Sequence, residues 1–382
     1  MVFNGLKYYS FGHSIGYGTA ALAYLEHLYQ KEKKISWNPI LLGEKTQAGI
    51  TDEFISTIPD QLREVLFSTA IDNTYSHKII HTTPEHFPAI INTKKENIGM
   101  TVWETDRLPT EWLKPLSVLD KIIVPCKWNK EVFANAGIKQ PIYVLPHISQ
   151  FKGVPVELSS NIPEDAFVFL NVSVWEKRKN MEQLLEVFFK AFPHQKNVLL
   201  VLKTSDKDIG KHFLRIWKYS YFINTSHKVS VLKLKHKAYT AKVMVIQEKV
   251  STQYMQYLYS RANAYVSLTH AEGWGMGVFE SAWYGKPVIT TNYSGYLDFL
   301  SPENSFLIDC KPGPVIQNHW DYKRLESHCW AMPDTDHAIS LMQSVYNNYT
   351  NALEKARLLK QNIENNFSAE VITDKFLDII NE

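Results

Sequence analysis

Residues 263–292, NAYVSLTHAEGWGMGVFESAWYGKPVITTN, contain the pattern that decides the predicted fold. An apolar strand is predicted at residues 264–268, and a short amphipathic helix follows it and stops near Gly285. A second apolar strand is predicted at residues 287–291. This order of strand, helix and strand is typical of an α/β protein with a parallel sheet.

The loop between the first of these strands and the helix has the composition of an anion-binding site. Glu272 and Glu280 flank a glycine-rich run that includes Gly275, Met276 and Gly277. Backbone N–H groups at the start of a helix have no partner within the helix and carry partial positive charge. The loop is therefore predicted to hold an anionic ligand.

The chain length of 382 residues predicts two domains, because a single core rarely grows beyond about 250 to 300 residues. A loop rich in Gly, Pro and Ser at residues 148–165 predicts the boundary, which gives domains at 1–150 and 151–368. The last helix, at 369–382, is expected to pack back on the first domain.

Charge is distributed unevenly along the chain, although the net charge is only +2. Residues 203–249 contain 11 Lys or Arg and 3 Asp or Glu, a net charge of +8. This segment also interleaves its basic residues with Phe213, Trp217, Tyr219, Tyr221 and Tyr239. Such a patch can bind nucleic acid or an anionic membrane surface. A solvated, amphipathic insertion is the alternative interpretation.

The three cysteines, Cys126, Cys310 and Cys329, are too few and too widely spaced for a disulfide framework or a metal cluster. They predict a reducing compartment. The N-terminus lacks the pattern of a secretory signal, and no apolar run approaches the roughly 18 residues that a bilayer span requires. The expected location is cytoplasmic, and peripheral membrane contact stays open.

Polar residues follow the predicted strands of the first domain, at 76–81, 97–102, 121–124 and 141–145. Ligands of open α/β sheets bind at the carboxyl ends of strands. Each polar residue alone is more often structural, but together they predict the wall of a polar cleft. They are His81, Glu104, Asp106, Arg107, Lys127 and His147.

Glycines also connect the first strand, at 6–11, to a helix predicted at 20–29. This loop, with Gly16 and Gly18, is predicted to cradle a phosphate, although it lacks the G-x-G-x-x-G order. A tight turn is the alternative interpretation.

The second domain starts with a strand predicted at 166–174 and a basic turn that includes Arg178 and Lys179. Asn180 follows and is predicted to be the N-cap of an amphipathic helix. The two cations therefore lie beside a helix N-terminus, where an anion would be stabilised.

These residues together resemble the retaining GT-B glycosyltransferases that use nucleotide sugars. The resemblance rests on the E-x7-E motif of Glu272 and Glu280, the AWYGKPV that follows it, and Lys179-Asn180. In the first domain, GMTVWETDRLPTEW, VPCKWN and VLPH look like a branch of the same family. The resemblance covers nearly the whole chain and implies two Rossmann-like domains that face each other across a cleft.

The resemblance implies transfer of a hexose or related sugar from a UDP- or GDP-sugar to an acceptor hydroxyl, without an obligatory metal. Lys179 with Arg178 would stabilise the leaving diphosphate, Glu272 would bind the sugar hydroxyls, and Glu280 would bind the ribose. The predicted catalytic residues are Glu272, Lys179 and Glu104. Gly275, Met276, Gly277, Gly16 and Gly18 are predicted to bind the donor, and His81, Asp106 and Arg107 are the acceptor-side candidates.

Two positions depart from the pattern of the family. Ser173 replaces an arginine that many members have, so neutralisation of the diphosphate would depend on Lys179. Trp103 and Glu104 stand where many members have a histidine, so the residue that lines the reaction centre stays open among Glu104, Asp106 and His81.

Other functions also stay open. The acceptor is not identified, and a modified DNA base is one alternative acceptor. A non-catalytic protein that binds sugar nucleotides is a second alternative, and an unrelated dehydrogenase is a third. Oligomeric state is not predicted.

Overall fold

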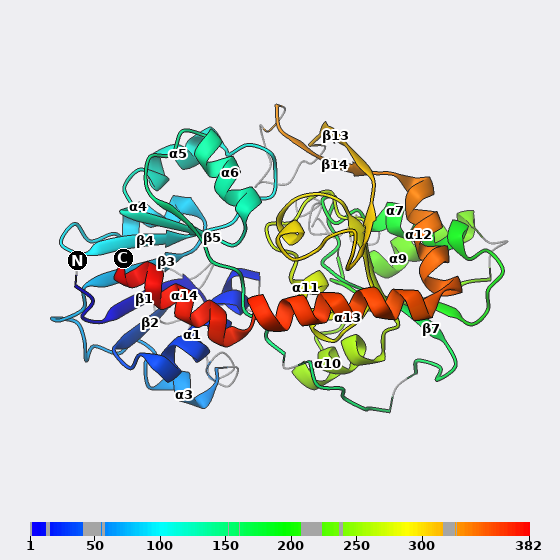
Figure 1. Cartoon of the computed structure of the whole chain (residues 1–382), viewed down its shortest axis with the longest axis horizontal. Coiled ribbons are helices and arrows are strands. Elements are labelled where there is room, and N and C mark those ends of the chain that lie inside the picture. Colours follow the sequence, from blue (N-terminus) through cyan, green and yellow to red (C-terminus); the bar gives the residue numbers. More distant parts are fainter. Residues whose placement is uncertain are drawn as a thin grey trace. The chain divides into compact units, whose positions relative to one another are not determined.

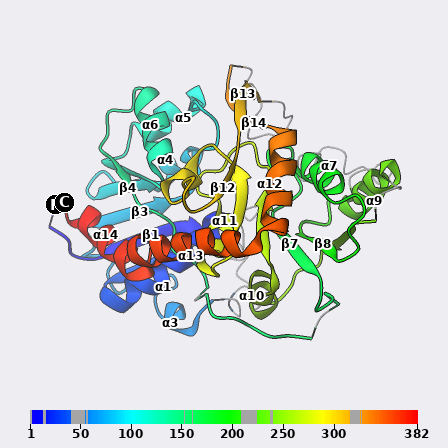
Figure 2. The ribbon, with the colours of Figure 1, turned by 45° about the vertical axis from the view of Figure 1, so that its right-hand side comes forward.

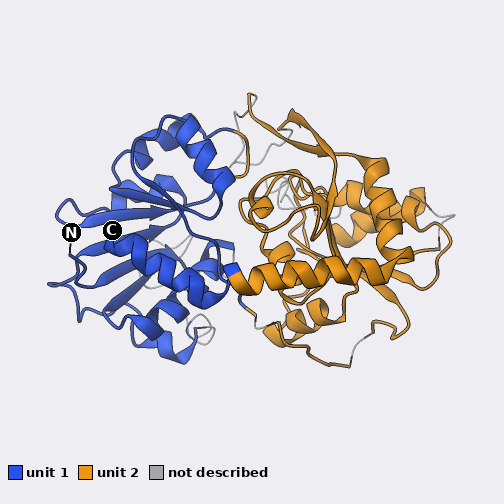
Figure 3. Cartoon of the chain, viewed as in Figure 1, with its two compact units in different colours: residues 1–103, 107–150, 366–382 blue, residues 104–106, 151–365 orange. Residues whose placement is uncertain are grey.

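The computed structural model describes residues 2–12, 16–40, 55, 58–151, 153–159, 161–207, 224–236, 240–315, 325 and 327–382. These residues form two compact units, which Figure 3 shows in different colours. The first unit comprises residues 1–103, 107–150 and 366–382, and the second comprises 104–106 and 151–365. Three residues of the second unit, Glu104–Asp106, thus interrupt the first.

The first unit contains a six-stranded parallel sheet in the order β2-β1-β3-β4-β5-β6 (Figure 1). Its central strands are buried on both faces, as parallel strands between helices usually are. The strands are β1 (Leu6–Phe11), β2 (Ile35–Ile40), β3 (His77–His81), β4 (Glu96–Met100), β5 (Lys121–Val124) and β6 (Ile142–Val144). The helices are α1 (Gly16–Lys31), α3 (Asp60–Arg63), η2 (Pro84–His86), α4 (Phe87–Ile90), α5 (Thr110–Leu116) and α6 (Lys127–Asn135).

The helix α14 (Ala369–Asn381) completes the core of the first unit. It lies beside α1, as Figures 1 and 2 both show. The rings of Tyr24 and Phe376 meet with centroids 5.5 Å apart. The apolar face of α14 is buried in the same cluster as the strands, and it consists of Ile372, Phe376, Ile379 and Ile380.

The second unit contains a six-stranded parallel sheet in the order β12-β11-β10-β7-β8-β9. Its strands are β7 (Phe167–Val172), β8 (Val198–Lys203), β9 (Lys242–Ile246), β10 (Ala264–Ser267), β11 (Val288–Thr291) and β12 (Phe306–Ile308). Its helices are α7 (Met181–Ala191), α9 (Thr225–Lys235), α10 (Thr252–Arg261), α11 (Met276–Trp283), η5 (Gly295–Asp298), α12 (Thr335–Asn347) and α13 (Tyr349–Asn366). The chain turns back between β7 and β10, and ligands of such sheets bind at this switch point.

A two-stranded antiparallel hairpin follows β12. It consists of β13 (Cys310–Pro314) and β14 (Cys329–Pro333). No helix among the described residues is long and apolar enough to span a membrane.

The predicted pair of parallel α/β domains is confirmed. The predicted strand at 6–11 coincides with β1, and the strand at 121–124 coincides with β5. Ser251 caps α10 by accepting a hydrogen bond from the Tyr254 N–H. The motif helix and both of its flanking strands are also present as α11, β10 and β11.

Three local features differ from the predictions. Gly16 and Gly18, predicted in a loop, lie in the first turn of α1. Asn180 is the N-cap residue of α7, as predicted, but its backbone is left-handed and its side chain makes no capping hydrogen bond; its amide donates to the Leu268 carbonyl at 3.0 Å. The β13–β14 hairpin was not predicted. The five aromatic residues quoted from the basic segment lie outside the described residues.

Candidate functional site

A cluster of charged side chains lies at the switch point of the second sheet. Arg178 and Lys179 lie in the connection from β7 to α7, and Glu272 lies in the loop from β10 to α11. Because β7 and β10 are neighbours, both connections start from adjacent strand ends. The Lys179 Nζ lies 2.6 Å from Glu272 Oε1, and the Arg178 Nη1 lies 3.2 Å from Glu272 Oε2.

Arg178 connects three segments of the second unit. Its Nη1 donates a hydrogen bond to the Ala271 carbonyl at 2.8 Å. Its Nη2 lies 2.9 Å from a Glu176 oxygen and 3.6 Å from a Glu104 oxygen. The planar fork of a guanidinium can hold several acceptors at once, which a lysine could not do with the same geometry. Arg178 therefore fixes the segment of Glu104 and the loop of Glu272 to the β7–α7 connection.

Three carboxylates share two cations in this cluster, and none of the five side chains is more than 21% exposed. Burial acts to raise the pKa of Glu272, but the charges and hydrogen bonds of Lys179 and Arg178 outweigh it, so this pKa is lowered. Burial raises the pKa of Glu104, and Arg178 offsets this only in part. Glu104 therefore takes up a proton more readily than Glu272.

Two glycines shape the start of α11. Gly275 has a φ of 84°, which favours glycine. A Cβ atom on Gly277 would lie 2.3 Å from the Tyr265 hydroxyl and 3.0 Å from the Val172 carbonyl. The first turn of α11, which includes Met276, therefore lies directly against the carboxyl end of β7. Its free backbone N–H groups belong to the same strand edge as the charged cluster.

Glu280 is buried one turn further along α11, and only 2% of its surface is exposed. Burial, with a smaller contribution from the Glu280 charge, raises the pKa of Tyr284 to about 12 and also raises that of Tyr259. The two tyrosine rings stack with centroids 5.9 Å apart. Glu280 thus lies near a buried aromatic pair.

The hairpin holds the segment of Glu104 in the second unit. The Asp106 N–H donates to the Cys329 carbonyl at 3.1 Å, and the Cys329 N–H donates to Asp106 Oδ1 at 2.6 Å. The Thr105 hydroxyl lies 2.7 Å from His328 Nδ1. The carboxylate of Asp106 is therefore engaged in positioning its own segment.

The same hairpin also holds the loop of Glu272. The ring of Trp330 stacks on His270 with centroids 4.6 Å apart and an interplanar angle of 14°. The His270 carbonyl and ring are also fixed, since the carbonyl accepts from the Ala331 N–H at 3.0 Å and the ring Nδ1 lies 2.6 Å from the Ala331 carbonyl. Burial lowers the pKa of His270 to about 4, so its ring is neutral near pH 7.

In the first unit, two buried histidines lie beyond strand ends. His81 ends β3, and its Nδ1 lies 2.8 Å from the Tyr8 hydroxyl. His147 follows β6, and its Nδ1 lies 3.0 Å from the Tyr24 hydroxyl. Burial lowers the pKa of His81 to about 3 and that of His147 to about 4. Both rings are therefore neutral near pH 7 and can exchange hydrogen bonds without charge.

The structure thus brings together part of the predicted set. Glu272, Lys179, Arg178 and Glu104 form one cluster. The remaining donor-binding candidates of the second unit lie along the adjacent loop and helix: Gly275, Met276, Gly277 and Glu280. Four candidates belong to the first unit: His81, Arg107, Gly16 and Gly18. Among them, Arg107 is exposed and His81 is buried.

Sequence reasoning missed two members of the site. Glu176 lies two residues before Arg178 in the basic turn. Its role as a partner of Arg178 can be inferred only once both side chains are known to be buried. His270 lies inside the opening stretch, but its partners are about sixty positions later, so no local pattern signals its role. Among the described residues, no group of three or more His, Cys, Asp or Glu is arranged to hold a metal ion.

Comparison with known families identifies the part of the chain that carries this site. Residues 157–314 match the family described as glycosyl transferases group 1. The second unit carries a glycosyl transferases group 1 domain. The group 1 domain includes Lys179, Glu272 and Glu280, and its match ends with β13.

Solved structures share the fold of both units. The sucrose-phosphate synthase of Thermosynechococcus elongatus is 13% identical with a TM-score of 0.66, and the match covers 99% of this chain and 98% of that chain. HepE of Anabaena, solved with UDP-glucose, is 10% identical with a TM-score of 0.64, and the match covers 99% of both chains. These similarities show the GT-B fold around the group 1 domain.

One curated relative matches part of the chain. It is the ORF313 protein of Acidianus filamentous virus 1, whose name assigns it provisionally to the glycosyltransferases. The two sequences are 22% identical over 201 residues, which is 51% of this chain and 53% of the relative. The similarity thus extends over about half the length of that relative.

Proposed function

We propose that this protein is a retaining glycosyltransferase that moves a hexose or related sugar from a UDP- or GDP-sugar to an acceptor hydroxyl, without an obligatory metal. The observation that carries the proposal is the placement of Arg178, Lys179 and Glu272 at the switch point of the group 1 domain. The UDP-glucose bound to HepE supports the choice of donor class.

Lys179 and Arg178 stabilise the diphosphate as negative charge develops on it. Both cations bind Glu272 in the structure, so the diphosphate and Glu272 would share the same positive charge. Arrival of the diphosphate weakens the hold of Lys179 on Glu272. The Glu272 carboxylate then accepts hydrogen bonds from the sugar hydroxyls, which need desolvated partners for recognition.

Other residues complete the donor site. The backbone N–H groups of Gly275, Met276 and Gly277 add donors for the diphosphate. Glu280 accepts hydrogen bonds from the ribose, which requires the ribose to reach it beside Tyr284. In the proposed function, residues 151–368 bind the donor.

In the transfer step, the acceptor oxygen forms a bond to the anomeric carbon on the face from which the diphosphate leaves. The bond between that carbon and the diphosphate oxygen breaks, and the proton of the acceptor passes to the diphosphate. Glu104, whose pKa is raised by burial, is suited to hold this proton during transfer. Residues 1–150 bind the acceptor, with His81 and Arg107 as contacts and Gly16 and Gly18 beside the donor.

The experiment measures the binding of nucleotide sugars by thermal shift and calorimetry. UDP- or GDP-sugar is expected to raise the melting temperature, and Lys179→Gln is expected to weaken binding by about tenfold or more, because it removes one charge-assisted contact. Lys177→Gln is the matched control, since Lys177 lies in the same connection but is exposed. Equal losses in both variants, or no binding of any nucleotide sugar, would contradict the proposal.

The three described cysteines are free thiols, which supports the proposed cytoplasmic location. No described feature favours a second function, because the aromatic part of the basic segment lies outside the described residues. The proposal therefore names no acceptor.

A further inference from the structure

A cavity of about 820 Å³ lies at the opposite edge of the second sheet from the charged cluster. Its lining includes Ala166, Asn197 and Ala241, each of which directly precedes a strand: β7, β8 and β9. The charged cluster follows the carboxyl end of β7. Because β7 and β8 have six residues each, roughly 20 Å of sheet separates the two edges. The cavity is therefore a separate site.

The rim of this cavity is basic. Lys196, Lys233 and Lys242 line it together with one carboxylate, Asp165. Among the residues that the structure describes, none of these three lysines forms an ion pair, whereas the nearby Lys190 pairs with a glutamate at 2.7 Å. The excess of cations over carboxylates favours an anionic occupant.

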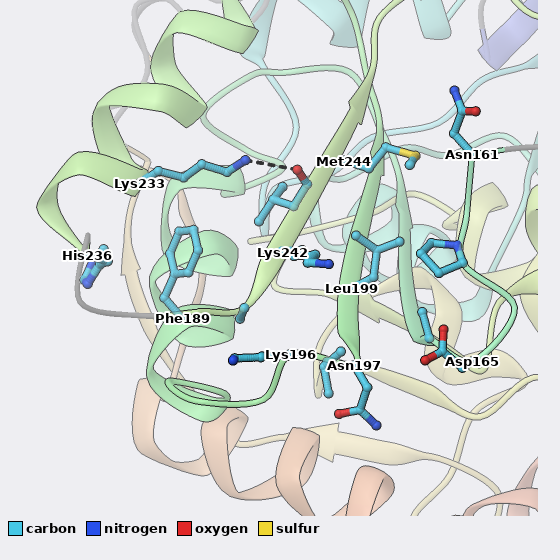
Figure 4. A pocket seen from close by; sticks show the side chains of 15 residues that line it. Asn161, Asp165, Phe189, Lys196, Asn197, Leu199, Lys233, His236, Lys242 and Met244 are labelled. Carbon is cyan, nitrogen blue, oxygen red and sulfur yellow. Dashed lines mark hydrogen bonds between the residues drawn. The ribbon is translucent and has the colours of Figure 1, made fainter.

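Lys233 is already fixed toward the cavity by the fold. It reaches from α9 to the edge strand β9, where its Nζ donates to the Val243 carbonyl at 3.0 Å (Figure 4). Desolvation lowers the pKa of Lys233, so an anion beside the ammonium group would favour its charged form. Edge strands are often protected by lysine, and Lys242 on β9 also fits that role. Lys196, which precedes β8, is not explained by it.

Apolar side chains also line the cavity. They include Leu199, Met244 and Phe189, and the ring of Phe189 lies beside His236 with centroids 5.4 Å apart. Figure 4 shows Phe189 and Lys233 on one side of the strands and Asp165 on the other. A cavity of this volume is within the range that holds small organic molecules.

The cationic side chains of the lining indicate the class of ligand. The described lining residues include three lysines and one further basic side chain, His236, and no arginine is among them. A lysine ammonium group acts as a point charge and is a common phosphate ligand in proteins. We propose that this cavity binds a small phosphate-bearing molecule whose apolar part lies on Leu199 and Met244.

The test is a titration of the protein with phenyl phosphate and with inorganic phosphate, followed by calorimetry at constant ionic strength. Phenyl phosphate is expected to bind saturably and more tightly than inorganic phosphate, because its ring adds apolar contact. The double variant Lys196→Gln with Lys242→Gln is expected to weaken this binding by at least tenfold. Unchanged melting temperature establishes that the variant is folded.

Two controls test whether the loss of phenyl phosphate binding is specific to this cavity. The double variant Lys190→Gln with Lys360→Gln makes the same change in net charge at lysines that already pair with glutamates, and it should bind phenyl phosphate normally. Lys179→Gln should also bind it normally, because that lysine belongs to the donor cluster. Equal loss in either control, or binding that does not saturate, would overturn the proposal without affecting the proposed transferase activity.

A phosphate on a larger molecule is distinguished by two further titrations. A single-stranded oligonucleotide and phosphatidylglycerol vesicles are tested with the same variants. If either binds through Lys196 and Lys242 while phenyl phosphate does not bind, the occupant is a polymer or membrane surface, and the small-molecule proposal is wrong.

Discussion

At the scale of single residues, Glu272 has two roles, of which only the binding of sugar hydroxyls was predicted from the sequence. Its carboxylate binds both cations of the cluster, and it is also the proposed acceptor for the sugar hydroxyls. One carboxylate thus partly neutralises two cations. In the proposed function, affinity for the bare nucleotide is therefore set partly by how readily Glu272 releases Lys179.

Glu272→Gln tests this link. The variant removes the competing charge, so UDP is expected to bind as well as before or several-fold more tightly. The ratio of the affinity for UDP-sugar to the affinity for UDP is expected to fall about tenfold, because a neutral amide is a weaker partner for the hydroxyls than a carboxylate. Calorimetry with UDP and UDP-sugar measures both. A parallel loss of affinity for the two ligands would show that Glu272 only supports the fold.

His81 and His147 make the stability of the first unit dependent on pH. Their folded-state pKa values are about 3 and about 4, below the unfolded value of about 6.5. Between these values the unfolded chain binds protons that the folded chain does not, so the free energy of unfolding falls as pH decreases below 6.5. Each histidine contributes about 1.4 kcal/mol per pH unit.

His81→Gln is therefore expected to reduce the slope of stability against pH between 6.5 and 5, measured by urea unfolding. His147 and His77 leave a residual slope, since burial lowers the pKa of each of them as well. His194→Gln, at an exposed position, is the control and should keep the original slope. The same slope in both variants would mean that His81 is charged in the folded protein.

At the scale of elements, the first turns of α1 and α11 differ in what surrounds their glycines. A Cβ on Gly16 would meet nothing within 4 Å, whereas one on Gly277 would lie 2.3 Å from the Tyr265 hydroxyl. Gly277 is thus required for close packing of α11 on the strand ends, and Gly16 is not. The predicted phosphate cradle at Gly16 has no such close approach.

Gly16→Ala and Gly277→Ala form a matched pair. Gly16→Ala is expected to stabilise the protein by up to about 1 kcal/mol, because alanine favours the helix. Gly277→Ala is expected to destabilise it by roughly 1–3 kcal/mol, because the clash displaces β10 or α11. Thermal unfolding measures both, and stabilisation by Gly277→Ala would rule out the tight packing described here.

The sequence predicted those elements whose signals are local. The strands β1 and β5 and the helix α11 follow from apolar periodicity. The β13–β14 hairpin was not predicted, because its pairing depends on partners such as Cys310 and Pro333 that are far apart in sequence. Asn180 was misread because its side chain donates to Leu268, which only the sheet brings close.

The same distinction between local and long-range signals applies to the site. Lys179 and Glu272 could be predicted to be neighbours, because each follows a strand and the two strands are adjacent at the switch point. The burial of Arg178 among Glu104, Glu176 and Glu272 could not be predicted, because Glu104 reaches it from a segment more than seventy positions earlier. Charge neutralisation within the cluster thus depends on long-range packing for Glu104 and Glu272, whereas Glu176 is a local partner.

At the scale of the whole molecule, each unit has its own core, and the core of the first unit depends on the last helix. Phe376 is fully buried against Tyr24, and the Lys121 Nζ donates to the Ile379 carbonyl at 3.1 Å. The first unit is therefore built from segments at both ends of the chain.

Phe376→Ala is expected to destabilise the first unit by about 3–5 kcal/mol, because it leaves a cavity in a packed core. Hydrogen exchange should show the loss of protection in β1 and β3 but not in β7 and β8. Val371→Ala, on the same helix but 42% exposed, is the control and should change stability by less than about 1 kcal/mol. Equal loss of protection in both units would mean that they unfold as one.

The position of α14 also determines the order in which the units can fold during synthesis. Domains usually fold as units in the order in which they leave the ribosome. Here the first sheet is synthesised first, but its core stays incomplete until residues 366–382 follow the whole of the second unit. The second unit is therefore the first that can reach its native state. Until α14 emerges, the nascent first sheet exposes the apolar surface around Tyr24 that this helix later covers.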